Sequence, residues 1–210
     1  VELAFNREDQ TQIEAIQLAL ARAQLPQARF AEARRLASQI LQTATSPDTI
    51  AQDEFMLSTA DSLEGSDLRS ALEHVQAAET QLRLAVEQGS APHGRLAEVK
   101  FQRASIAAQQ GDLSEAVALY SEAMEIADHS DQPTAPQFRI LSRNNLAYHM
   151  HLLRPGDPAA LAYAEEGLRL AQEQGNLGMM TYLYSTEGEI ALGQGDLETA
   201  ERHFKDGLSL

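Results

Sequence analysis

A pattern that recurs about every 42 residues is the feature that most constrains the fold of this chain. The motif Gly-Asp-Leu-x-x-Ala-x-x-x-aromatic begins at Gly111 and begins again at Gly195. Related copies begin near Ala28, Gly65 and Gly156, so that five copies account for the 210 residues. A period of this length is typical of solenoids, in which each repeat is one supersecondary unit that packs against its neighbours.

Each copy is expected to form two antiparallel helices. Apolar residues at i, i+3, i+4 and i+7 precede the turns, as in residues 141–153, and this spacing predicts amphipathic helices. The Gly tolerates positive φ and ends the first helix, and the Asp after it can cap the second. Clusters rich in Pro and Gly separate the copies. The sequence thus predicts a single domain, 1–210, with hairpins at about 6–45, 48–88, 93–130, 136–174 and 177–210.

The composition favours the same all-α fold. Ala (34) and Leu (28) dominate, while Val, Ile and Thr together number 23, which leaves little material for strands. Small residues at fixed positions should let helix axes approach closely. They are expected at Ala21, Ala104, Ala147 and Gly188 on first helices and at Ala33, Ala116, Ala160 and Ala200 on second helices.

Charge and residue types exclude several classes of function. A net charge of −15, with only two Lys, argues against direct binding of nucleic acid or anionic membranes. The chain has no Cys, no membrane-spanning apolar run and no evident signal peptide, so a cytoplasmic location is expected. Because it starts at Val1 and ends within an expected helix, we expect it to be part of a longer protein.

No catalytic motif is evident. The chain lacks a P-loop and a Gly-x-Ser-x-Gly element, and no His has a Glu three positions before it. His149 and His151 are two residues apart, so on a helix they point in different directions and cannot chelate one ion together. We therefore expect no enzyme activity, no cofactor and no metal.

The repeat resembles the tetratricopeptide repeat family. The residues that carry the resemblance are Gly111-Asp112-Leu113, then Ala116 and Tyr120, and their counterparts from Gly195 onward. The period is similar to the 42-residue variants in kinesin light chains and in the sensor domains of MalT-like or LuxR-like regulators, and the segment 143–147 (Arg-Asn-Asn-Leu-Ala) is similar to the kinesin-light-chain type. The resemblance implies a right-handed α-α superhelix of about five hairpins and ten helices.

The resemblance also implies a concave groove lined by the first helix of each hairpin. Mapped onto this chain, the inner wall of the first two copies consists of Ala15, Leu18, Arg22 and Leu25, followed by Asp53, Met56, Ala60 and Leu63. In the later copies, side chains that could grip a peptide form the candidate partner-binding site: Phe101, Asn144, Tyr148, His151, Tyr182 and Ser185.

Structural roles compete with these assignments. Asn144 is expected to make a hydrogen bond between repeats, and Tyr148 is equally suited to wedging between hairpins. His151 is expected near the rim of the groove. Tyr120 and Phe204 are predicted core residues.

The resulting hypothesis is a non-catalytic protein–protein interaction module that binds a peptide or partner segment in its groove. If Asp53, Glu98 and Glu189 share the groove, they favour a basic partner. One alternative is a regulatory domain of a larger signalling or transcription protein that senses a ligand or peptide, and another is a hydrolytic enzyme. Self-association through the terminal hairpin is also expected.

Overall fold

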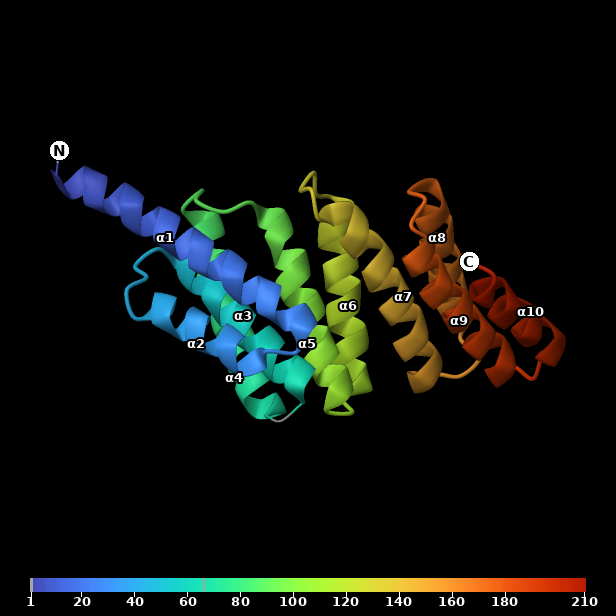
Figure 1. Ribbon diagram of the computed structural model, residues 1–210. Helices are drawn as coiled ribbons and strands as arrows, with labels where there is room; N and C mark the ends of the chain where they lie inside the picture. The colour runs from blue at the N-terminus through green and yellow to red at the C-terminus, as the bar shows by residue number, and fades with distance from the viewer. Residues whose placement is uncertain (1, 66) are drawn as a thin grey trace. The chain divides into compact units, whose positions relative to one another are not determined.

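The computed structural model describes residues 2–65 and 67–210, with side chains from residue 12 onward, and this part of the chain forms helices without strands (Figure 1). The all-α prediction is confirmed. The helices are α1 (Glu2–Gln24), α2 (Phe30–Leu41), α3 (Pro47–Glu64), α4 (Leu68–Glu87), α5 (Leu96–Gln109), α6 (Leu113–Asp128), α7 (Ala135–Leu153), α8 (Pro158–Glu173), α9 (Leu177–Gly193) and α10 (Leu197–Leu208), with short 3-10 helices at Leu25–Gln27 and His93–Arg95.

The helices divide into two compact units, residues 1–92 and 93–210. Within the first unit α1 packs on α2, α2 on α3 and α3 on α4, and within the second α5 to α10 pack in chain order. Each unit therefore consists of helical hairpins. That the five hairpins act as one domain stays a prediction.

The turns inside the hairpins have the predicted chemistry. Gly111 and Gly195 have φ values of 85° and 80°, which side chains disfavour. The Asp112 carboxylate accepts a hydrogen bond from the Glu115 backbone N–H at 3.0 Å, and Asp67 and Asp196 cap α4 and α10 with the same spacing. Asp157 caps α8 by accepting from the backbone N–H two residues on, at Ala159. The first hairpin departs from the motif, because Ala28 takes the left-handed conformation (φ 54°) that Gly provides elsewhere.

Small residues occupy the helix contacts, as predicted. The eight small positions named from the repeat are all buried. Tyr120 is buried as predicted, but Phe204 is only half-buried. Its ring lies where a Cβ on Gly188 would project, and it also lines a cavity of about 240 Å³, so one side of the ring lacks core packing.

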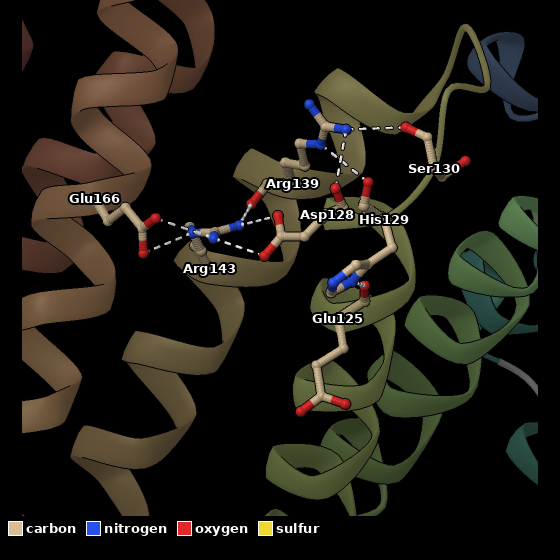
Figure 2. Close-up of polar contacts among 8 residues, drawn as sticks. Glu125, Asp128, His129, Ser130, Arg139, Arg143 and Glu166 are labelled. Carbon is tan, nitrogen blue, oxygen red and sulfur yellow. Dashed lines mark hydrogen bonds and ion pairs between the residues drawn. The ribbon is translucent and has the colours of Figure 1, made fainter.

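An ion-pair network around the buried Arg143 joins three helices of the second unit. Arg143 of α7 lies between Asp128 at the end of α6 and Glu166 of α8 (Figure 2). Its Nη1 and Nη2 donate to the two Asp128 oxygens at 2.9 and 2.8 Å, and Nη2 also donates to Glu166 Oε1 at 3.1 Å. One turn earlier, Arg139 donates to the backbone oxygens of Asp128 and Ser130 and so satisfies carbonyls at the end of α6. The network fixes α7 between its neighbours.

Candidate functional site

The first helices of the second unit lie next to one another. Helix α7 contacts both α5 and α9 directly. We call the surface formed by α5, α7 and α9 the first-helix face. The six residues of the predicted site all come from these three helices.

Two tyrosines are the most exposed aromatic residues of the predicted site. Tyr148 of α7 is 37% exposed and Tyr182 of α9 is 65% exposed. The Tyr148 ring has an edge contact with His149, at a centroid distance of 5.3 Å, and its exposure shows that it is not part of the buried core. An exposed aromatic side chain offers a large apolar area and a hydroxyl, the combination that is enriched at protein interfaces.

Asn144 links two first helices. Its Oδ1 accepts a hydrogen bond from Thr186 Oγ1 at 2.9 Å, which joins α7 to α9 across 42 positions in the sequence. The expected hydrogen bond between repeats is thus confirmed. It brings Asn144 against the helix that carries Tyr182 and Ser185, so three of the six predicted residues lie on directly connected turns.

Phe101 and Ser185 have different surroundings. Phe101 is half-buried and packs edge-on against Tyr120 and Phe138, with centroids 5.2 and 5.5 Å apart. Ser185 is exposed and lines the cavity beside Phe204.

The expected position of His151 near the rim is wrong. The side chain is only 9% exposed and lies under Gly193 of α9. A Cβ at position 193 would collide with the imidazole, so the absence of a side chain there lets α9 approach and cover His151. The Nδ1 atom makes no hydrogen bond within the described structure.

The first unit contains a cleft at positions that the repeat mapping assigns to the inner wall. A cavity of about 480 Å³ lies between α1 and α3, with Ile40 of α2 contributing one side chain. Its described lining includes four of the eight mapped residues, Ala15, Leu18, Arg22 and Asp53. The remaining described lining residues are Glu14, Ala19, Asp48, Thr49 and Gln52. We call this cavity the α1–α3 cleft.

Asp53 is the unusual residue of the α1–α3 cleft. Its exposed fraction is 0%, and neither carboxylate oxygen has a hydrogen-bond partner. Burial raises the pKa of Asp53 to about 7, helped by the negative charges of Glu14 and Glu54, while Arg22 acts in the opposite direction. The repeat mapping placed Asp53 in the groove, but nothing in the sequence shows that its carboxylate lacks a partner.

A second buried acid lies between α8, α9 and α10. Glu187 lines a cavity of about 280 Å³ and is 2% exposed. Burial raises its pKa to about 7, and the charge of Glu165 adds to the effect. His203 Nδ1 lies 3.1 Å from Glu187 Oε2, and burial, with Arg202, lowers the pKa of this imidazole. Both shifts favour the neutral forms of the two groups.

Glu187→Gln is expected to change how stability depends on pH. Because the folded pKa lies above the ordinary value of 4.5, the folded chain loses stability as the pH rises from about 4.5 to about 7. The amide cannot ionise, so the variant should gain about 1–3 kcal/mol over the wild type at about pH 8 and less at about pH 5.

Urea unfolding followed by tyrosine fluorescence measures this effect in the second unit, because all five Tyr lie in residues 93–210. Glu189→Gln, at an exposed acid of the same helix, is the matched control. Equal gains at both pH values would show that ionisation of Glu187 is not the cause.

In residues 12–65 and 67–210 no group of three or more His, Asp or Glu side chains is arranged to hold a metal ion. Within the described part of the chain, no helix is long and apolar enough to cross a membrane.

Solved structures of other proteins have a fold similar to that of this chain. No protein-family model matches the chain, and no curated protein sequence matches it. BtubC (BKLC) from P. vanneervenii superposes with a TM-score of 0.78 at 20% identity, covering 98% of this chain and 84% of that chain. A Podosopora anserina putative kinesin light chain with nearly identical TPR-like repeats gives 0.68 at 16%, covering 93% of each chain.

A third match is a Rap protein complexed with Competence and Sporulation Factor. Its TM-score is 0.74 at 16% identity, and the match covers 99% of this chain and 57% of that chain. At such identities the matches establish the fold. The chain has the fold of the tetratricopeptide-like helical repeat proteins, as its sequence pattern predicted.

Proposed function

We propose that this chain is a protein-interaction module that binds a peptide or partner segment on its first-helix face. The observation that carries the proposal is the exposure of Tyr148 and Tyr182 on adjacent helices that the Asn144–Thr186 hydrogen bond connects. Aromatic anchors on a preformed surface are the usual source of binding energy in protein interfaces. The fold supports the proposal, because one match with this fold is a Rap protein in complex with Competence and Sporulation Factor.

The same surface suits the sensing role. In a regulatory domain, a ligand or peptide on the first-helix face would favour one arrangement of the hairpins and transmit a signal to other parts of a longer protein. The complex of the Rap protein is the observation that favours this second function.

The charge of the chain favours a basic partner. The net charge is −15, and the exposed Glu189 lies on α9 of the first-helix face. Attraction of this kind raises association rates and weakens as salt screens it. Binding of the partner should therefore weaken with increasing salt.

Self-association through the terminal hairpin stays a prediction. Leu208 is exposed, and beside it the cavity of about 240 Å³ is lined by Thr181, Ser185, Phe204 and Gly207. These side chains form a small, largely apolar surface on α9 and α10.

A displayed library of random peptides tests the proposed function without a known partner. Peptides selected on the wild-type chain should bind Tyr148→Ala/Tyr182→Ala at least about tenfold more weakly, since two aromatic anchors are lost. The matched control is Leu84→Ala/Leu197→Ala, at exposed apolar residues of second helices. Circular dichroism checks that helicity is kept. Equal affinity for the wild type and the tyrosine variant would rule out this surface.

A further inference from the structure

The fold accounts for one buried acid of α3 and leaves another unexplained. Asp61 is buried, but it accepts hydrogen bonds from Arg34 of α2 at 3.0 Å and from Ser70 of α4 at 2.8 Å. Asp53, on the same helix, is more deeply buried and has no hydrogen-bond partner. A buried carboxylate without a partner is costly, and the great majority of buried polar groups are hydrogen-bonded. Asp53 therefore requires an explanation beyond packing.

The α1–α3 cleft supplies a reason to retain this carboxylate. Asp53 is one of the residues that line this cavity of about 480 Å³, and its covered carboxylate belongs to the wall of a space that a ligand can enter. Arg22 is the one base among the described lining residues, and its guanidinium donates to Gln52 Oε1 at 3.4 Å. Glu14 and Asp48 add negative charge to the same lining. The cleft thus combines an excess of acids over its one base, Arg22, with a buried carboxylate that has no hydrogen-bond partner.

The lining also shows which kind of cation fits. Ala15, Leu18, Ala19 and Ile40 give the cleft an apolar wall. A bare metal ion is a poor match, because the described acids do not form a group that could hold one. An alkyl chain that ends in an ammonium group matches both halves of the lining, because its methylene groups can cover apolar surface while its charge meets a carboxylate.

We propose that the α1–α3 cleft binds a primary alkylammonium group, with Asp53 as its counter-charge. This proposal goes beyond the peptide-binding function, because it concerns another unit of the chain and specifies the chemistry of the ligand. The ammonium can come from a lysine side chain of a partner or from a free amine.

The proposal also implies that binding depends on pH. Asp53 must lose its proton to pair with an ammonium, and burial, with Glu14 and Glu54, holds its pKa near 7. The charged groups around it are Glu14 and Arg22 of α1 and Asp48 and Glu54 of α3. From α4, the imidazole of His74 contacts Glu54 at 2.6 Å, and α2 contributes the apolar Ile40. Amine affinity should therefore rise between about pH 6 and about pH 8.

Nuclear magnetic resonance titrations of the full chain at about pH 8 test the proposal. The probes are Nα-acetyl-lysine N-methylamide, 1,4-diaminobutane and, as the uncharged control, Nα-acetyl-norleucine N-methylamide. Both amines should shift the Asp53 side-chain resonance saturably, and the norleucine derivative should not. Tighter binding of the lysine derivative would identify a partner side chain as the source, and tighter binding of the diamine would identify a free amine.

Two variants complete the experiment. Asp53→Asn should weaken amine binding by at least about tenfold, while Glu87→Gln, at an exposed acid of α4, should change it less than about twofold. A readout without substitution is the pKa of Asp53, which a bound ammonium must lower. The proposal is overturned if no amine binds saturably, if Asp53→Asn binds amines as the wild type does, or if the amine leaves the pKa of Asp53 unchanged.

The proposed peptide-binding function can fail separately. Displayed peptides that depend on Tyr148 and Tyr182 should bind Asp53→Asn as they bind the wild type. Absence of amine binding together with retained peptide binding would refute only the proposed amine site in the α1–α3 cleft. The reverse result would refute only the proposed peptide binding on the first-helix face.

Discussion

Tyr120→Ala is expected to lower the free energy of unfolding of the second unit by about 3–5 kcal/mol. Tyr120 is buried, and its ring contacts those of Phe101 and His149, each at a centroid distance of 5.2 Å. Removal of the ring leaves a cavity among the buried residues of α5, α6 and α7, which include Ala104, Leu119, Leu146, Ala147 and Met150.

Tyr120→Phe separates the ring from its hydroxyl group. The hydroxyl oxygen lies 3.0 Å from Ser105 Oγ, and burial raises the pKa of the phenol against the opposing effect of Ser105. Loss of this one hydrogen bond should cost about 0.5–1.5 kcal/mol. Urea unfolding followed by the fluorescence of the remaining tyrosines gives the values. If Tyr120→Ala costs less than about 1 kcal/mol, the ring is not an anchor between helices.

Arg143→Met should destabilise the second unit by about 2–4 kcal/mol. The guanidinium is buried between Asp128 and Glu166, which are themselves partly exposed (Figure 2). Burial alone would lower the pKa of Arg143, but the hydrogen bonds to Asp128 and Glu166 outweigh it and raise the pKa. The methionine keeps most of the apolar stem and leaves both carboxylates without their partner.

Arg143→Lys is the informative control for this variant. It keeps the positive charge but cannot make the two parallel hydrogen bonds to the Asp128 carboxylate. The free energy of unfolding of Arg143→Lys should therefore lie between that of the wild type and that of Arg143→Met. The unfolding measurement is the one used for Tyr120. A cost below about 0.5 kcal/mol for Arg143→Met would mean that the network does not hold α7 against α6 and α8.

The sequence was sufficient to predict the features that depend on local chemistry. The Gly111-Asp112 turn, the small residues such as Ala116 and the burial of Tyr120 follow from helix periodicity and from the space between two helices. These features repeat, so each copy of the motif supports the others.

Features that depend on the approach of helices from different repeats could not be predicted. His151 is buried because Gly193, 42 positions later, lets α9 cover it. Phe204 is half-buried because one side of its ring lines a cavity. The repeat pattern placed Asp53 at the inner wall, yet its lack of a partner depends on where Arg22 of another helix points. A sequence pattern shows which face of a helix a residue occupies and not what lies opposite it.

A partner that binds on α7 and α9 of the first-helix face should protect the backbone amides of these two helices. Amide hydrogen exchange of the chain, with and without a displayed peptide selected on it, measures this most directly. Binding on this face should slow exchange in α7 and α9 around Tyr148 and Tyr182 and leave exchange in α8 and α10 unchanged. Slower exchange confined to α8 and α10 would contradict it.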